Sequence, residues 1–98
     1  MYVILTSKPG QFRTELSENL QPVEAYDYLF CGRKRAHFVI ASLSRETKIC
    51  IVDESSAPVV NRVPSKFLPK FETVEAARNE LKSLTRFGDM DISLVKCA

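Results

Sequence analysis

The sequence places one cysteine beside a run of positive charge, because Cys31 and Gly32 precede Arg33, Lys34 and Arg35. Neighbouring cations favour the thiolate, which is the reactive form of cysteine. Cys31 is therefore the candidate reactive thiol of the chain, and a thiol-based redox sensor or enzyme is one alternative function. A free cysteine is more commonly a small buried hydrophobic residue, and the sequence favours this interpretation for Cys31.

The same basic run is a candidate binding site for anions. Arginine and lysine at the tip of a β-hairpin present donors to phosphate or carboxylate groups, and Tyr26 and Tyr28 precede the run as stacking surfaces. The pattern thus offers Arg33, Lys34 and Arg35 with the two tyrosines as a site for nucleic acid or a phosphorylated ligand. Charged residues also keep an exposed tip soluble and pair across strands, and this plainer interpretation is favoured.

A second basic set, Arg62, Lys66 and Lys70, is spaced by four residues. On a helix this spacing would form a stripe, but Pro64 and Pro69 exclude a helix there. On an extended chain the three side chains can share one side and face a partner, although scattered solvation of a loop explains them as well.

The segment that carries this second set, residues 59–71, combines prolines with apolar residues, Phe67 among them. Connections of more than about 12 to 15 residues without secondary structure are uncommon in compact domains and often bind something. We expect its apolar side chains to dock on the chain's own sheet, and the alternative is an apolar patch for a protein partner. Phe67 therefore joins the candidate binding residues.

No motif for catalysis, a metal or a cofactor stands out. His37 is the only histidine, and its neighbours in the sequence do not supply the nucleophile and orienting carboxylate of a catalytic dyad. Cys31, Cys50 and Cys97 miss the spacings of zinc sites and are too few for a disulfide framework. The three glycines cannot form a phosphate-binding loop. We therefore expect no metal, no cofactor and a structural His37.

The composition is that of one small globular domain over residues 1–98, with 45% hydrophobic and 27% charged residues. A net charge of +2 is too small to indicate nucleic acid by itself. The apolar runs are far shorter than the roughly 20 residues that cross a bilayer, and Lys8 and Pro9 interrupt the start too early for a secretory signal. We expect a cytoplasmic protein with reduced thiols and no membrane partner.

The first half of the chain is predicted to be mostly strand. Residues 2–6 and 12–16 form an expected hairpin, whose type II turn uses Pro9 and Gly10. Residues 23–31 fit either a strand or a helix that begins at Pro22 and ends before Gly32. The strand is favoured because a strand pattern resumes at residue 36 directly after a short turn.

The second half adds a strand pair and a helix. Residues 36–43 and 48–53 are the clearest strands, and we expect them to pair as an antiparallel hairpin at the centre of the core. Thr73 is the expected N-cap of a helix, with Gly88 beyond its end. One face of that helix carries the apolar residues Val74, Ala77, Leu81 and Leu84. Residues 92–95 are expected as a final edge strand.

These elements predict an α+β fold, an antiparallel sheet of five or six strands with one helix from the C-terminal half packed on it. If residues 11–31 were helical, the order would become the ferredoxin-like βαββαβ. The missing catalytic motif and the charged, apolar connections favour a noncatalytic accessory or regulatory module that binds a protein partner. Nucleic-acid or phosphorylated-ligand binding ranks below it.

Overall fold

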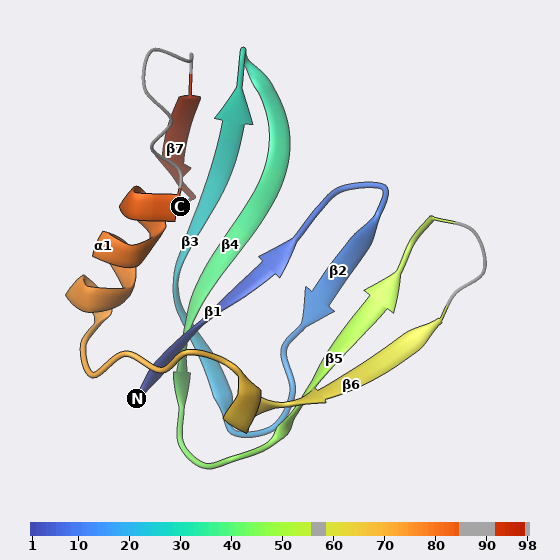
Figure 1. The fold of residues 1–98 in the computed structure, drawn as a ribbon, viewed down its shortest axis with the longest axis vertical. Coiled ribbons are helices and arrows are strands. Elements are labelled where there is room, and N and C mark those ends of the chain that lie inside the picture. The colour runs from blue at the N-terminus through green and yellow to red at the C-terminus, as the bar shows by residue number, and fades with distance from the viewer. Residues whose placement is uncertain (56–58, 85–91, 98) are drawn as a thin grey trace.

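Strand-forming residues dominate the chain, and the computed structural model, which describes residues 1–55, 59–84 and 92–97, is accordingly built mostly of strands (Figure 1). One α-helix follows in the C-terminal half, so the predicted α+β class is confirmed. The elements in chain order are β1 (Tyr2–Ser7), β2 (Phe12–Glu15), β3 (Leu20–Phe30), β4 (Arg33–Leu43), β5 (Lys48–Asp53), β6 (Val60–Pro64), the 3-10 turn η1 (Ser65–Phe67), α1 (Val74–Leu84) and β7 (Ile92–Lys96).

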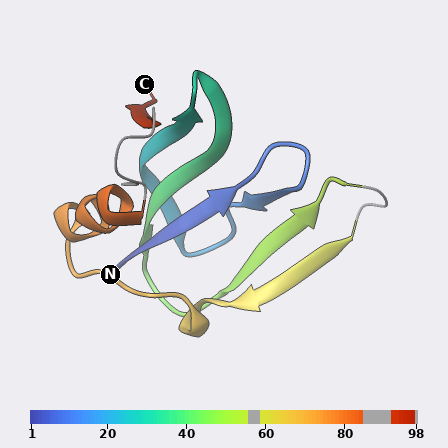
Figure 2. The same ribbon diagram turned by 45° about the horizontal axis from the view of Figure 1, so that its top comes forward.

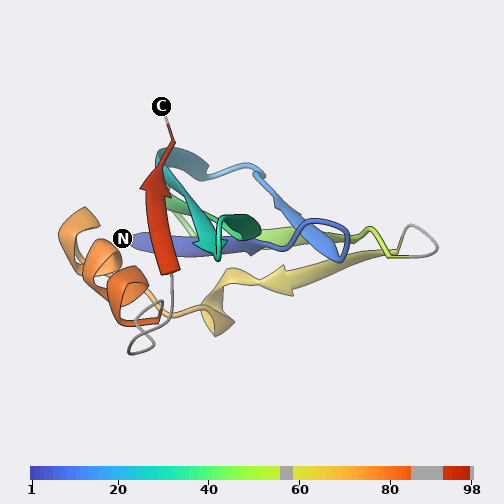
Figure 3. The same ribbon diagram turned by 90° about the horizontal axis from the view of Figure 1, so that it is seen from above.

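The strands form two antiparallel sheets, whereas one sheet of five or six strands was expected. The first sheet has the order β1-β4-β3-β7 and the second has the order β2-β5-β6. Figures 2 and 3 show β5 and β6 extending away from the end of the molecule where α1 and β7 lie. Within the described residues the strand count is therefore seven, and β7 is an edge strand as predicted.

The predicted hairpin of residues 36–43 with 48–53 is wrong, although both strands exist. β4 has neighbours on both edges, β1 and β3, so it has no edge left for β5. The backbone N–H groups of Leu43 and Ser44 donate to Met1 O and Asn19 O, at 2.8 and 2.9 Å, which keeps the chain in the first sheet until it turns into the second.

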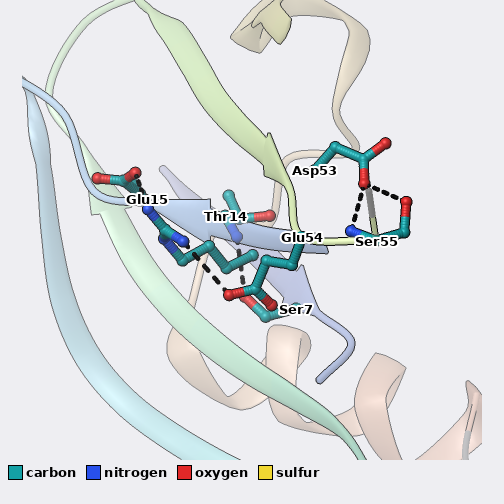
Figure 4. Close-up of polar contacts among 7 residues, drawn as sticks. Ser7, Thr14, Glu15, Asp53, Glu54 and Ser55 are labelled. Atoms are coloured by element: carbon teal, nitrogen blue, oxygen red, sulfur yellow. Dashed lines mark hydrogen bonds and ion pairs between the residues drawn. The ribbon is translucent and has the colours of Figure 1, made fainter. Parts of the chain in front are cut away.

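The predicted hairpin of residues 2–6 with 12–16 has the expected turn, but its two strands do not stay paired. The Gln11 N–H donates to Lys8 O at 3.0 Å and Gly10 has a φ of 78°, as a type II turn requires. Beyond the turn the two strands separate into different sheets. A hydrogen bond from the Thr14 N–H to Ser7 Oγ, 2.9 Å long, still links β1 and β2 (Figure 4). At the nearby end of β5, the N–H and Oγ of Ser55 donate to the Asp53 carboxylate.

Residues 23–31, which fitted either a strand or a helix, belong almost entirely to strand β3. The ferredoxin-like alternative, which needed a helix there, is therefore not observed. Only Cys31 and Gly32 separate β3 from β4. Their φ values of 51° and 76° are the two positive angles of a type I′ turn, the turn that matches the twist of a two-residue hairpin. The turn therefore consists of Cys31 and Gly32, and Arg33 already belongs to β4.

Two apolar clusters hold these elements together. Between the sheets lies the buried cluster Val3, Leu5, Leu20, Ala41, Leu43 and Ile49, with Leu68 packed against it from the chain after η1. On the other face of the first sheet, Ile40 packs with Ala77 and Leu81 of α1. β4 therefore has both faces covered, which explains its continuous apolar sequence.

The helix begins as the sequence predicts. Thr73 Oγ1 accepts the Ala76 N–H at 3.0 Å, which is the side-chain N-cap bond to the third helical residue. On the expected apolar face, Ala77 and Leu81 are fully buried, but Leu84 is 53% exposed. Gly88, expected beyond the helix end, lies outside the described residues. In the part of the chain that is described, no helix is long and apolar enough to span a bilayer.

Candidate functional site

The three cations of the candidate basic site follow the turn of the β3–β4 hairpin and differ in their surroundings. Arg33, Lys34 and Arg35 are all exposed at the start of β4. The Lys34 ammonium lies 3.2 Å from Asp27 Oδ1, so it is paired within the protein. The register of the two strands shifts between Tyr28 and Leu29, which makes Arg35 the extra residue of a bulge on β4. Cys31 is exposed on the turn itself.

The two tyrosines that precede the tip lie on the face that carries α1. Tyr26 Oη donates to Glu24 Oε1 at 2.8 Å, and Tyr28 packs edge-on against Phe38 with ring centroids 6.4 Å apart. Tyr28 lines a shallow hollow together with Arg35 and Lys8. The structure therefore brings Tyr28 and Arg35 together, while Tyr26 serves an internal bond.

Glu24 accepts that bond as part of an ionic network between the first sheet and α1. The Arg78 guanidinium binds it through Nε at 2.6 Å and through a second nitrogen at 2.5 Å, and Lys96 Nζ lies 3.2 Å away. These bonds, from Arg78 first and Tyr26 next, lower the pKa of Glu24 from 4.5 to about 2. The network positions α1 and is structural.

The second basic set is divided by the fold. Arg62 is exposed on β6, and Lys66 is exposed on η1 with its ammonium 5.4 Å from the centre of the Phe67 ring. Lys70 instead points inward, because its Nζ donates to Ser65 O and pairs with Glu46 Oε1, both at 3.2 Å. Lys70 is therefore paired within the protein, whereas Arg62 and Lys66 are exposed.

Ser65 is the buried polar residue that fixes η1. Its Oγ donates to Glu46 Oε2 at 2.6 Å and accepts the Thr47 N–H at 2.9 Å, and its side chain is fully buried. Sequence patterns give no sign of this role, since serine after proline is common in loops. Because Ser65 begins η1, these bonds determine where the exposed Phe67 stands.

Replacing Ser65 by alanine should lower the free energy of unfolding by about 1–3 kcal/mol, since the partly buried Thr47 N–H then loses its acceptor and the Glu46 carboxylate loses a donor. Urea unfolding monitored by circular dichroism measures this change. Ser44→Ala removes an exposed hydroxyl whose bonds to Asn19 are long, at 3.3 and 3.4 Å, and it should change stability by no more than about 0.5 kcal/mol. Equal effects of the two substitutions would contradict the assigned role of Ser65.

The two basic sets do not converge. Figures 1 and 2 show the β3–β4 tip and η1 at opposite ends of the molecule. The fold therefore does not join the two basic sets into one continuous surface. Binding of nucleic acid depends on such a surface, because it neutralises several phosphates at once.

One group of reactive side chains went unnoticed in the sequence. Asp27 on β3 lies opposite His37 on β4, and its Oδ1 is 2.8 Å from His37 Nδ1. Cys97 joins them after β7, so that one ligand atom from each of the three residues lies within 4.8 Å of the other two. Ten residues separate Asp27 from His37, and only the strand register reveals that they meet.

The charges in this group favour a protonated thiol. The imidazole of His37 contributes most to lowering the pKa of Asp27, with the Lys34 ammonium adding to the effect. Burial raises the pKa of the Cys97 thiol, and the neighbouring Asp27 carboxylate raises it further. A thiol of this kind is a poor nucleophile at neutral pH, so the group does not have the character of an activated cysteine–histidine pair.

The second sheet ends in an exposed strand. Among the described strands β6 pairs only with β5. It carries the half-exposed Val60, at 52%, and is followed by Phe67, whose exposure of 70% is high for a phenylalanine.

Searches of family models, of curated proteins and of solved structures give no match to this chain.

Proposed function

We propose that this chain is a noncatalytic accessory or regulatory module of the cytoplasm that binds a protein partner through β6 and η1. The binding surface, called here the β6–η1 surface, consists of Val59, Val60, Arg62, Lys66 and Phe67. The observation that carries the proposal is the position of Phe67, which is 70% exposed and follows a strand that pairs with β5 alone among the described strands. Aromatic side chains that protrude in this way are typical anchors of protein interfaces.

The backbone of β6 suits the addition of a further strand. The Asp53 N–H donates to Val59 O and the Ser65 N–H donates to Thr47 O, both at 2.8 Å. Bonding alternates along an antiparallel pair, so the backbone groups of Val60 and Arg62 point away from β5. An extended segment of a partner can hydrogen-bond to these groups, as in β-strand addition.

The side chains around this edge define the partner's chemistry. Arg62 and Lys66 are exposed cations, and Lys66 sits over the face of Phe67. Val59 and Val60, at 49% and 52% exposure, add apolar side chains at the end of β6 that is farther from η1. The partner segment should therefore be extended, apolar on one side and acidic at its margin.

Photo-crosslinking tests the proposal in cells. A photoreactive phenylalanine analogue placed at position 67 should crosslink one main protein, and the same analogue at Val23, which is 46% exposed on β3, should not. With the partner identified, Phe67→Ala should weaken binding by roughly 30-fold, the size of an interface hot spot. Identical crosslinks at the two positions, or unchanged affinity of Phe67→Ala, would refute the proposal.

A second candidate function follows from the hollow that brings Lys8, Tyr28 and Arg35 together. Two cations beside an aromatic ring can bind a small phosphorylated ligand. The Arg33/Lys34/Arg35 triple alanine variant, compared with the wild type in low-salt mobility shifts and in phosphate titrations, tests this candidate. This candidate ranks second because the cations of the second basic set lie on β6 and η1, away from this hollow, and do not add to its positive charge.

A further inference from the structure

Three strands bring together one carboxylate, one imidazole and one thiol. Asp27 and His37 face each other across β3 and β4, and the Cys97 N–H donates to Ala25 O at 2.8 Å. This bond continues the pairing of β7 with β3, so Cys97 stands opposite Ala25, two residues before Asp27 on the same face. Backbone bonds therefore hold all three side chains on one patch of sheet.

We propose that Asp27, His37 and Cys97 bind one divalent transition-metal ion of the zinc type. Nitrogen, sulfur and carboxylate ligands are the set that Zn²⁺ takes in proteins. Three protein ligands leave one coordination position for water, as in zinc sites that remain open. This metal site is independent of the β6–η1 surface and of the protein partner proposed above.

The dimensions of the group fit such an ion. Zinc–ligand bonds of about 2.0–2.3 Å place tetrahedral ligand atoms roughly 3.3–3.7 Å apart. In the structure His37 Nδ1 and Asp27 Oδ1 are 2.8 Å apart, and all three ligand atoms lie within 4.8 Å of one another. Rotation of the side chains is enough to close the site, because the backbone already places the residues together.

Burial and charge also fit. The side chains of Asp27 and His37 are each 30% exposed, so an ion can enter and yet be partly shielded from water. The Cys97 sulfur and the Asp27 carboxylate lie within 4.8 Å of each other, and a dication compensates the negative charge of both ligands. Lys34, the competing cation 3.2 Å from Asp27 Oδ1, is 47% exposed and can swing into solvent.

Cobalt binding to the reduced protein is the test. Co²⁺ substitutes for Zn²⁺, and thiolate coordination gives a sulfur-to-cobalt charge-transfer band in the near ultraviolet. We expect one equivalent of Co²⁺ with this band, displaced by Zn²⁺ and unaffected by excess Mg²⁺, which prefers oxygen ligands. Absence of the band from the wild type would overturn the proposal.

Cysteine variants give matched controls. Cys97→Ser should remove the band, whereas Cys31→Ser and Cys50→Ser should keep it. Native circular dichroism of Cys97→Ser is the check that this variant folds. Should Cys97→Ser unfold, protection of a single thiol from alkylation by Zn²⁺ in the wild type, mapped by peptide mass, provides the same assignment. Protection of Cys31 or Cys50 in place of Cys97 would contradict the site.

Two further substitutions should change the affinity for zinc in opposite directions. Asp27→Asn should weaken zinc affinity by at least about 10- to 100-fold, the loss seen when even an orienting carboxylate is removed from a metal site. Lys34→Gln removes the competing cation and should tighten binding by up to about fivefold. Weaker zinc binding by the Lys34→Gln variant would contradict the proposed geometry.

Discussion

Leu81→Ala is expected to lower the free energy of unfolding by about 2–5 kcal/mol, the cost of a cavity in a close-packed core. Leu81 is fully buried in the cluster that joins α1 to Ile40 of β4. The helix contacts the first sheet through few fully buried side chains, Ala77 and Leu81 among the described residues. Loss of one of them therefore removes much of the apolar contact that keeps α1 in place.

The same helix supplies a matched control. Leu84→Ala makes the identical chemical change where the side chain is 53% exposed, and it should change stability by no more than about 0.5 kcal/mol. Urea unfolding at neutral pH, followed by circular dichroism, compares the two variants. Similar effects at Leu81 and Leu84 would show that the helix does not pack on the sheet as described.

Acid should destabilise the protein between about pH 4.5 and pH 2 through Glu24. Its pKa falls from 4.5 to about 2 in the folded state, chiefly because Arg78 binds the ionised carboxylate. In this pH range the unfolded state binds more protons at this site than the folded state, so stability rises with pH. The contribution is complete above about pH 4.5 and is lost as the pH falls toward 2.

Glu24→Gln tests this expectation. The variant should be less stable than the wild type at pH 6, and the difference should shrink as the pH falls from 4.5 to 2. Glu75→Gln removes one charge from an exposed position at the start of α1, and its profile accounts for the change in net charge. A constant difference between Glu24→Gln and wild type over this range would contradict the network around Glu24.

Several features of the fold could be read from the sequence because they depend on neighbouring residues. The Thr73 cap, the turn at Pro9 and Gly10 and the apolar face of α1 each follow from groups within a few positions of one another. Continuous runs of β-branched and aromatic residues likewise identified β4 and β5 as strands. Local chemistry fixes these elements, so the class of fold followed from them.

Pairing of the strands did not follow from local chemistry. Two adjacent apolar strands, β4 and β5, were expected to form a hairpin, yet each pairs elsewhere. An apolar strand shows that its faces are covered but not which strand lies at its edge, because backbone bonds are the same for every residue type. The division into two sheets was therefore invisible in the sequence.

The candidate sites illustrate the same limit. The cations were identified by residue type, but whether each is exposed or paired depended on distant partners, such as Glu46 for Lys70 and Asp27 for Lys34. The meeting of Asp27, His37 and Cys97 depends on the register of three strands. A shift of one residue would turn the side chains to opposite faces.

The sequence by itself determined that this protein is built from strands and one capped helix, and that arginine, lysine and phenylalanine are available between its clearest elements. Only the tertiary structure decided which of them stay free, which edge is open and which thiol lies beside the histidine. The physical reason is that secondary structure arises from interactions along the chain, whereas a site is made by register and packing between residues that are far apart in sequence.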